Sequence, residues 1–199
     1  MLNRHRAAAA AIAALGRTAP AVLDVGCRDG ALGRALRAAQ AGARVVGLDR
    51  SGSPDVVGDV RRLPFADRAF DVVAALDVLE HCDDLRGAFL ECLRVADTLL
   101  LVSLPNMAHP LFRARFACTG RLSGKYDLGD ARQPDRHRWL TPLAQADRLM
   151  AMLAREHQLG IAISRVTEGR RAALLAGLLR PLCANAQLWA WTSLYALRR

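Results

Sequence analysis

VLDVGCRDG, from Val22 to Gly30, is a short apolar run that ends in an acid and continues into a glycine-containing turn. Parallel sheets bind nucleotide-like ligands at such strand ends, and Gly26 lets the backbone turn tightly beneath a ligand. A second apolar run, RVVGLDR, ends in Asp49, whose carboxylate is suited to both hydroxyls of a ribose. Two strand ends therefore indicate one site, and a cofactor-binding enzyme is the first hypothesis.

The first half of the chain alternates short apolar runs with helical patterns. AVLDVG, ARVVGLD, DVVGDV, FDVVAALDVL and TLLLVSLP read as the first five strands, and ALGRALRAA and LRGAFLECLRVA read as helices. The second of these helices has Asp83 or Asp84 available as its N-cap. This alternation predicts an α/β fold with a Rossmann-like, doubly wound and mostly parallel sheet of about seven strands.

The second half is less regular. Residues 105–141 are rich in Arg, Gly, Asp and Pro, which predicts a substrate-facing cover with one short helix at residues 111–117. After it we expect a helix capped by Thr141, with Pro142 at its first position, that runs to about His157. The remaining expected elements are strands at 161–166 and 187–197, separated by a helix that stops at Pro181. Adjacent strands near the end of the chain predict an antiparallel edge strand.

Length and composition favour one domain over residues 1–199, because 199 residues of 52% hydrophobic content bury one substantial core. Its expected parts are an N-terminal helix in 1–20, a cofactor-binding half in 21–104, the cover in 105–141 and a C-terminal helix and strands in 142–199. The basic, alanine-rich start imitates a secretory signal, but a helix before the first strand explains it better. No run reaches the roughly 18 apolar residues of a membrane span.

The cysteine content and the net charge limit the compartment and the partners that are expected for this protein. Five cysteines without a C-x-x-C pair argue against a disulfide framework and a zinc site, so we expect a reduced, cytoplasmic protein without metal. The net charge of +9 favours anionic partners such as nucleic acid, phosphorylated sugar or lipid surfaces. A solvated arginine surface explains it equally well, because no compact basic block with interleaved aromatics is present.

Four motifs together carry a resemblance. LDVGCRDG, the acid of VVGLDRS, the stretch GDVRRLPFADRAFDVV and then ALDVLEH closely resemble the class I S-adenosylmethionine-dependent methyltransferases of the type 11-like family, from about Ala21 to Asn106. LPFADRAFDVV is the most specific of the four. The resemblance implies S-adenosylmethionine as cofactor, S-adenosylhomocysteine as product, and direct displacement at a sulfonium carbon in an aligned, dry site.

The resemblance also implies a role for each cofactor-binding residue. Asp24, Gly26 and Cys27 would line the methionine part, and Asp49 would hold the ribose hydroxyls. The other implied positions are Gly30 at the helix entry, Arg50 beside the adenine, Asp59 and Val60 on the adenine amine and ring, and Asp77 next to the methyl group.

Arg28 is the one departure from the family pattern, which usually has a second glycine at this position. Its side chain is expected to crowd the cofactor, to point outward or to pair with the cofactor's carboxylate. A non-catalytic cofactor-binding or interaction subunit is therefore an alternative function.

Histidines at strand ends are the candidate catalytic residues. His81 and His109 follow the fourth and fifth expected strands, and an imidazole titrates near neutrality, so either is suited to accept a proton from the methyl acceptor. A loop histidine bonded to the backbone explains each equally well. His137 is a third candidate, with Trp139 as a pocket wall.

The acceptor is expected to be a small molecule or a glycan, methylated on an oxygen or, as second choice, a nitrogen. SLPNMAHP lacks the D/N-P-P-Y/F signature, and no Pro-Cys nucleophile is present, so RNA or DNA methylation is only an alternative. LPN and RHRWLTP are similar to bacterial small-molecule and cell-envelope glycan methyltransferases. Five arginines of the cover suit an anionic acceptor: Arg113, Arg115, Arg121, Arg132 and Arg136.

The aromatic tail allows two interpretations. Trp189, Trp191 and Tyr195 are suited to a peripheral membrane contact. A final strand with these residues on one face is simpler, and then removal of residue 187 onward should unfold the protein.

Overall fold

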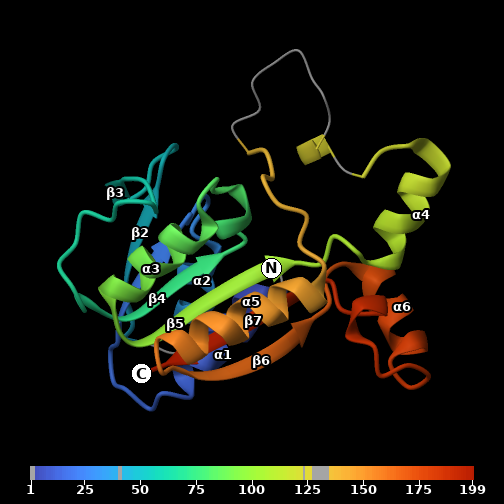
Figure 1. Cartoon of the computed structure of the whole chain (residues 1–199). Helices are drawn as coiled ribbons and strands as arrows, with labels where there is room; N and C mark the ends of the chain where they lie inside the picture. Colours follow the sequence, from blue (N-terminus) through green and yellow to red (C-terminus); the bar gives the residue numbers. More distant parts are fainter. Residues whose placement is uncertain (1–2, 40–41, 123, 127–134) are drawn as a thin grey trace.

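A computed structural model describes residues 3–39, 42–122, 124–126 and 135–199 (Figure 1). It contains one seven-stranded sheet in the order β3-β2-β1-β4-β5-β7-β6. The strands are β1 (Ala21–Val25), β2 (Arg44–Asp49), β3 (Val56–Val57), β4 (Phe70–Leu76), β5 (Ala96–Pro105), β6 (Gly160–Val166) and β7 (Thr192–Arg198). The sheet is mostly parallel, which confirms the predicted fold class.

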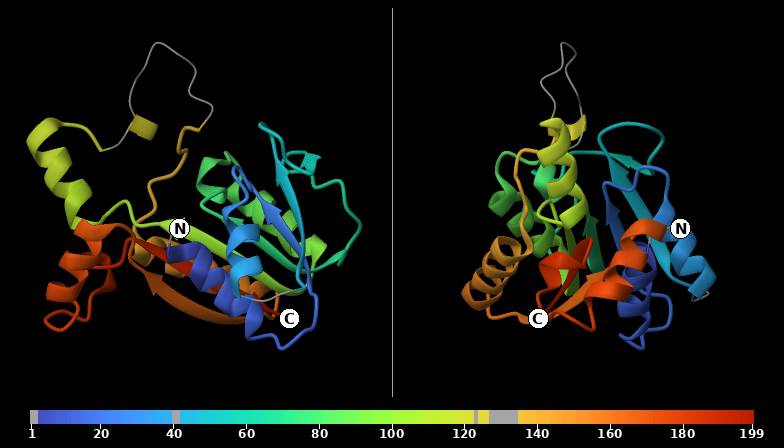
Figure 2. Two further views of the ribbon diagram at one scale, coloured as in Figure 1. Left: turned by 180° about the vertical axis from the view of Figure 1, so that it is seen from behind. Right: turned by 90° about the vertical axis from the view of Figure 1, so that its right-hand side faces the viewer.

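Helices cover both faces of this sheet (Figure 2). One face packs against α1 (Asn3–Ala13) and α2 (Ala31–Ala39), and the other against α3 (Leu85–Val95) and α5 (Leu143–Glu156). The remaining helices are α4 (Pro110–Thr119), α6 (Arg170–Leu179) and the 3-10 turns η1 (Leu79–His81), η2 (Gly124–Tyr126) and η3 (Ala186–Leu188). The protein is thus a three-layer sandwich with α4 and α6 beyond one end of the sheet (Figure 1).

The register of the parallel strands brings the predicted site residues to one edge. Asp24 in β1 lies opposite Gly47 in β2 and Ala74 in β4, so the carboxyl ends of all three strands meet there. Open α/β sheets bind ligands outside these carboxyl ends. The fold therefore brings Asp24 and the ends of β2 and β4 to the kind of sheet edge where the sequence predicts a site.

The antiparallel strand is β7, and it lies one position inside the edge. It pairs with β5 on one side and with β6 on the other, antiparallel to both. The predicted strand 187–197 was too long at its start, because residues 186–188 form η3 and β7 begins only at Thr192. Trp189 and Trp191 consequently precede the strand instead of sharing a face with Tyr195.

The C-terminal aromatics make their contacts inside the molecule. Tyr195 is fully buried, and its hydroxyl donates to Asp147 at 2.9 Å. The Trp191 ring packs against His109 and Phe112, and Arg180 lies over the Trp189 ring. These contacts leave the expected membrane contact without support, and no helix in the described part of the chain is long and apolar enough to span a bilayer.

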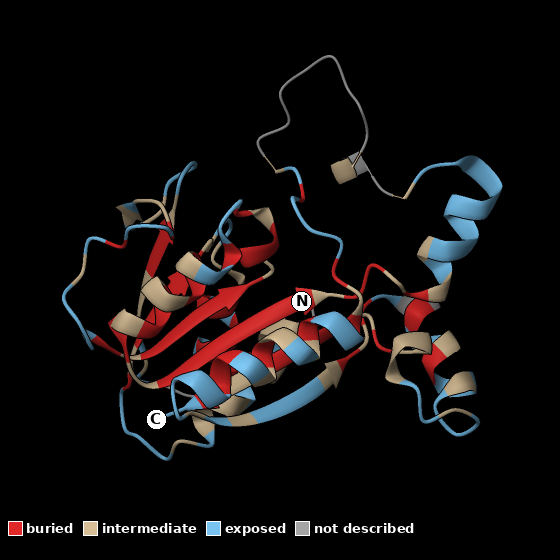
Figure 3. Cartoon of the chain, viewed as in Figure 1, coloured by how far each residue is buried: buried red, intermediate tan, exposed pale blue. Residues whose placement is uncertain are grey.

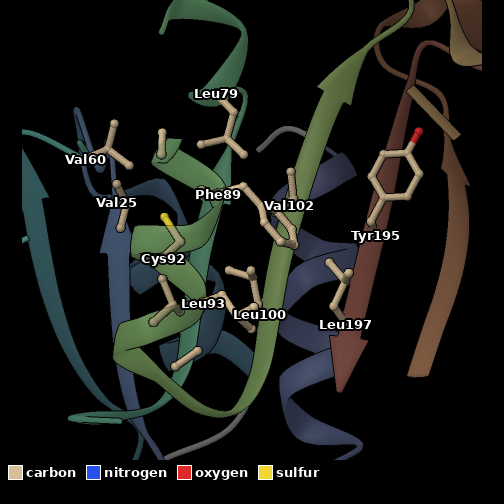
Figure 4. Close-up of a cluster of buried hydrophobic side chains, with 14 of the residues drawn as sticks. Val25, Val60, Leu79, Phe89, Cys92, Leu93, Leu100, Val102, Tyr195 and Leu197 are labelled. Carbon is tan, nitrogen blue, oxygen red and sulfur yellow. The ribbon is translucent and has the colours of Figure 1, made fainter. Parts of the chain in front are cut away.

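The larger cluster of buried apolar side chains lies between the sheet and helices α3 and α5. Phe89, Cys92 and Leu93 of α3 pack on Leu100 and other buried residues of the central strands (Figure 4). Central strands β4 and β5 are almost wholly buried, whereas α4 and most of β6 face solvent (Figure 3). Burial of apolar surface therefore holds the sheet together from β1 to β7.

The local helix signals are partly confirmed. Asp84 caps α3 by accepting from the amide of Gly87 at 2.8 Å. The Thr141 cap was wrong, since the Thr141 hydroxyl donates to the Pro105 carbonyl and α5 begins after Pro142 without a side-chain cap. All five cysteines are free thiols.

Substitution of Tyr195 by alanine should strongly destabilise the fold. Loss of this fully buried ring from the inner antiparallel strand should lower the free energy of unfolding by about 3–5 kcal/mol, as for other large core residues. Leu174→Ala, at a side chain 71% exposed, should change it by less than about 0.5 kcal/mol. Urea denaturation followed by circular dichroism measures both. Equal effects would contradict a β7 that is integral to the core.

Candidate functional site

The turn after β1 requires glycine at residue 26. Gly26 has a φ of 69°, and a Cβ there would lie 2.5 Å from Cγ2 of Val78. The amides of Gly26 and Cys27 both donate to the Leu48 carbonyl, at 2.7 and 3.2 Å. Gly30, at a φ of 71°, then leads into the N-terminus of α2. The turn is thus held against β2 and η1, with the N-terminus of α2 beside it.

Asp24 is a buried carboxyl at the centre of this edge. Only 4% of the residue is exposed. Burial, with smaller contributions from Asp29 and Asp49, raises the pKa of Asp24 to about 7. A cation next to this buried carboxylate would stabilise its charged form, because the attraction between them offsets part of the desolvation cost.

Arg28 keeps the backbone conformation of the glycine that the family usually carries. Its φ of 45° lies in the left-handed region, and its amide donates to Oδ2 of Asp49 at 3.0 Å. The side chain is 73% exposed and lies 3.6 Å from the Asp135 carboxylate. Of the three expectations for this residue, the structure thus favours a side chain that points outward.

The carboxylate of Asp49 is oriented by backbone amides. Oδ2 accepts from Arg28 and Oδ1 from Ser51, the latter at 3.2 Å. Cys27 packs against the same strand, since a Cβ on Gly47 would lie 2.8 Å from its Sγ. Burial raises the pKa of the Cys27 thiol to about 11, which keeps the thiol protonated.

The residues expected at the adenine lie together, with Asp59 already engaged. Its carboxylate accepts from the amide, Nε and Nη2 of Arg61, and these hydrogen bonds lower the pKa of Asp59. Arg50 approaches the same carboxylate at 3.7 Å, and Val60 is buried beside it. An adenine amine would share Asp59 with Arg61.

Asp77 ends β4 with a strained backbone and an engaged side chain. Its φ is 56°, its Oδ1 accepts from the Ser103 hydroxyl, and Arg4 of α1 lies 3.2 Å from its Oδ2. Arg4 also pairs with Glu168 at 2.7 Å. The N-terminal helix therefore fixes the acid that is expected next to the methyl group.

The two candidate histidines lie in different environments. His109 is fully buried, and its Nδ1 accepts from the Leu111 amide at the start of α4. His81 lies at the end of η1 with 19% of its side chain exposed. His81 contacts His137, since their ring centroids are 4.6 Å apart. The structure therefore brings His81 and His137 together and leaves His109 apart.

Glu80 joins this pair, and sequence reasoning missed it. It is fully buried, and its Oε1 lies 3.9 Å from Nε2 of His81 and 4.0 Å from Nε2 of His137. Burial and the Asp77 charge raise the pKa of Glu80 well above its usual value, and burial lowers the pKa of His137 to about 4. The available signal was the pair Glu80-His81 directly after a strand; the distance to His137 is set only by the fold.

Residues 135–139 pack against η1. The Arg138 amide donates to the Glu80 carbonyl, and the Trp139 indole donates to the Cys82 carbonyl. Trp139, the expected pocket wall, is 47% exposed. Of the five arginines of the expected cover, Arg113, Arg115, Arg121 and Arg136 are exposed, and Arg132 lies outside the described residues.

Residues 23–98 match the methyltransferase domain family, which spans the turn, both strand-end acids and α3. This stretch is similar to that family, and the chain has the class I methyltransferase fold. The domain is 39% identical over 62 residues to the demethylmenaquinone methyltransferase of Roseiflexus sp. (strain RS-1), which covers 30% of this chain and 26% of that protein. It is 36% identical over 92 residues to the ubiquinone biosynthesis O-methyltransferase of Hahella chejuensis, which covers 38% of each. This chain therefore matches well under half of either relative.

Solved structures share the methyltransferase domain fold over nearly the whole chain. The small RNA methyltransferase HEN1 aligns with a TM-score of 0.69 and 19% identity, over 99% of this chain and 25% of that one. Magnesium protoporphyrin IX methyltransferase of Synechocystis PCC 6803, with bound S-adenosylhomocysteine, aligns at 0.60 and 19%, over 99% and 82%. At these identities the likeness establishes the fold.

Replacement of Arg28 by glycine should stabilise the methyltransferase domain. Relief of a left-handed backbone is worth about 1–2 kcal/mol and exceeds the extra chain entropy of glycine, so the free energy of unfolding should rise by up to about 1 kcal/mol. Arg28→Ala keeps a Cβ and should show no such rise. Urea denaturation of both variants measures the difference, and a less stable Arg28→Gly variant would show that the arginine side chain is needed.

The buried Asp24 carboxyl should make stability depend on pH. Its folded-state pKa of about 7 exceeds the unfolded value of 3.8, so its stabilising contribution is complete below about pH 4 and is lost as the pH rises through 7. The Asp24→Asn variant should therefore gain roughly 3 kcal/mol on the wild type between pH 5 and pH 8, because about two pH units of that window lie below the folded-state pKa. Urea denaturation at both pH values tests this, and a constant difference between the two proteins would contradict it.

Proposed function

We propose that this protein transfers the methyl group of S-adenosylmethionine to an oxygen of a small acceptor molecule. One observation carries the proposal: the fold brings Asp24 and Asp49 to one sheet edge, on either side of a turn in which Gly26 has no room for a Cβ. The match of residues 23–98 to the methyltransferase domain family supports it.

The residues at this edge fit the cofactor in charge and shape. The buried Asp24 carboxyl suits the ammonium group of the methionine part, and Asp49 presents an oriented carboxylate to the ribose hydroxyls. Arg50, Asp59 and Val60 would receive the adenine, and Asp77 would lie next to the methyl group. Bound S-adenosylhomocysteine in the magnesium protoporphyrin IX methyltransferase supports the same cofactor class here.

The bound cofactor supplies an activated methyl group, and the chain supplies position and protection. Gly26 and the Leu48 carbonyl hold the turn, and Arg4 and Ser103 hold Asp77, so the binding groups are oriented before the ligand arrives. The segment of residues 135–139, docked on η1, would exclude water from the reacting end. The proton of the acceptor would leave towards the group of Glu80, His81 and His137, since His109 is buried with its Nδ1 engaged.

The acceptor class rests on two further observations. One relative is named a demethylmenaquinone methyltransferase and the other a ubiquinone biosynthesis O-methyltransferase, which supports a hydroxyl on a small molecule. The exposed arginines 113, 115, 121 and 136 suit a carboxylated or phosphorylated form of that molecule, and a glycan-like acceptor fits the same surface. RNA is the second candidate, supported by the net charge of +9. The five free thiols suit a reducing compartment such as the cytoplasm.

Calorimetric titration with S-adenosylmethionine and S-adenosylhomocysteine tests the cofactor. The wild type should bind both, and Asp49→Ala should weaken binding at least about tenfold through loss of the charge-assisted bonds to the ribose. Asp67→Ala is the matched control. It also removes a carboxylate, but the Asp67 side chain is 76% exposed and forms an ion pair with Arg94.

Transfer of a radiolabelled methyl group to small-molecule and RNA fractions then separates the functions. Label in the small-molecule fraction supports the proposal, and label in RNA favours the second candidate. A folded wild type that binds no cofactor would overturn the assignment, and binding without transfer to any fraction would favour the non-catalytic subunit.

A further inference from the structure

Three side chains converge at the end of η1 without satisfying one another. One ligand atom from each of Glu80, His81 and His137 lies within 4.8 Å of the other two. Apart from the amide of Glu80 itself, neither carboxylate oxygen of Glu80 has a hydrogen-bond partner among the described residues, and neither does Nε2 of His137. Buried polar atoms left without partners are rare, because each costs about 1–3 kcal/mol.

The hydrogen bonds behind the two imidazoles fix which nitrogen carries the proton. Nδ1 of His81 lies 3.1 Å from the Arg136 carbonyl, which only accepts, so this nitrogen donates. The Tyr126 hydroxyl donates its one proton to the Trp139 carbonyl at 2.7 Å, so Nδ1 of His137, 3.1 Å away, donates to that hydroxyl. In both neutral rings Nε2 therefore carries no proton and keeps a lone pair that can bind a cation.

The separations exclude a direct hydrogen bond between these groups. Glu80 Oε1 lies 3.9 Å from Nε2 of His81 and 4.0 Å from Nε2 of His137, beyond the 3.2 Å limit for N–H···O bonds. Asp135 adds a further carboxylate oxygen 3.3 Å from Nε2 of His81. Several acceptors thus surround one point, with side chains of low exposure: 0% for Glu80, 6% for His137 and 19% for His81.

We propose that Glu80, His81 and His137 bind a divalent metal cation. Protein nitrogen and oxygen ligands lie about 2.0–2.2 Å from such an ion, so two ligands of one ion lie roughly 3 to 4 Å apart, as these atoms do. Metal-binding histidines usually donate their second ring N–H to a carbonyl or similar acceptor, and both rings here do so. The cation takes the place of the hydrogen-bond donors that the Glu80 carboxylate and the two Nε2 atoms lack.

The donor set indicates the class of ion and its chemistry. Two imidazoles and one carboxylate suit Zn²⁺, Fe²⁺, Co²⁺ or Mn²⁺ better than Ca²⁺, which prefers oxygen ligands alone. Three protein ligands leave at least one position for water or for an oxygen of another molecule. A metal ion at this site would contradict the expectation from the sequence that the protein binds no metal, which rested on cysteine spacing alone. It does not depend on the proposed methyl transfer, since the binding test below omits the cofactor.

Titration of chelator-treated protein with Co²⁺, followed by visible absorption and by the unfolding midpoint, tests the site. We expect one Co²⁺ per chain, a raised unfolding midpoint, and a spectrum of nitrogen and oxygen ligation without thiolate charge transfer. Glu80→Gln and His137→Asn should each weaken binding at least about tenfold. Tyr126→Phe should weaken it less than either of these variants, because it removes only the partner of Nδ1 of His137.

His157→Asn is the control, because this exposed histidine at the end of α5 lies outside the cluster and should leave binding unchanged. Circular dichroism of each metal-free variant verifies that it is folded. Absence of Co²⁺ binding by the wild type overturns the proposal. A thiolate spectrum, or binding that survives in both Glu80→Gln and His137→Asn, overturns it as well. Elemental analysis of protein purified without added metal provides an independent readout, with about one equivalent expected.

Discussion

The architecture of the site depends on the absence of a side chain at Gly26. The backbone there turns through a left-handed conformation, is bonded to the Leu48 carbonyl and touches Val78, which leaves no space for a Cβ. Because of this contact, the ends of β1 and β2 and the start of η1 lie within one small region. Asp24, Asp49 and Glu80 reach the same edge of the sheet only because these three segments are held together.

Several acids lie close together at this edge of the sheet, and their negative charges repel one another. Arginine ion pairs neutralise some of these acids, and raised pKa values favour the protonated form of others. Arg4 neutralises Asp77 and Glu168, Arg61 neutralises Asp59, and the Asp49 carboxylate is oriented by backbone amides. Asp24 and Glu80 have no such compensation, and burial raises the pKa of both. Among the described residues, neither of these two buried carboxyl groups has an arginine partner, which is consistent with the proposed ammonium group at Asp24 and the proposed metal ion at Glu80.

Arg28 shows how a departure from a family pattern can preserve the structure behind it. A glycine usually occupies this position, and the left-handed backbone explains why. In this chain the arginine accepts the same conformation and directs its side chain outward, to within 3.6 Å of Asp135. Asp135 also lies beside His81, so this one contact links the turn after β1 to residues 135–139 on η1.

The sequence by itself determined the local elements and the strand-end acids. Alternating apolar runs specified β1, β2, β4 and β5, because buried parallel strands have a composition that is visible in a short window. The Asp84 cap was equally visible, since capping involves only residues a few positions apart. The position of β7 between β5 and β6 and the late start of that strand were not, because long-range pairing and packing of Trp191 on His109 decide them.

Only the tertiary structure decided which titratable groups act together. His81, His109 and His137 have similar local contexts in the sequence, and the fold buries one behind α4 while it joins the other two to Glu80. Their tautomers depend on the Arg136 carbonyl and the Tyr126 hydroxyl, which come from a segment distant from η1 in the chain. Local patterns report the conformation of neighbouring residues, whereas a converging set of ligand atoms requires contacts between residues far apart in sequence.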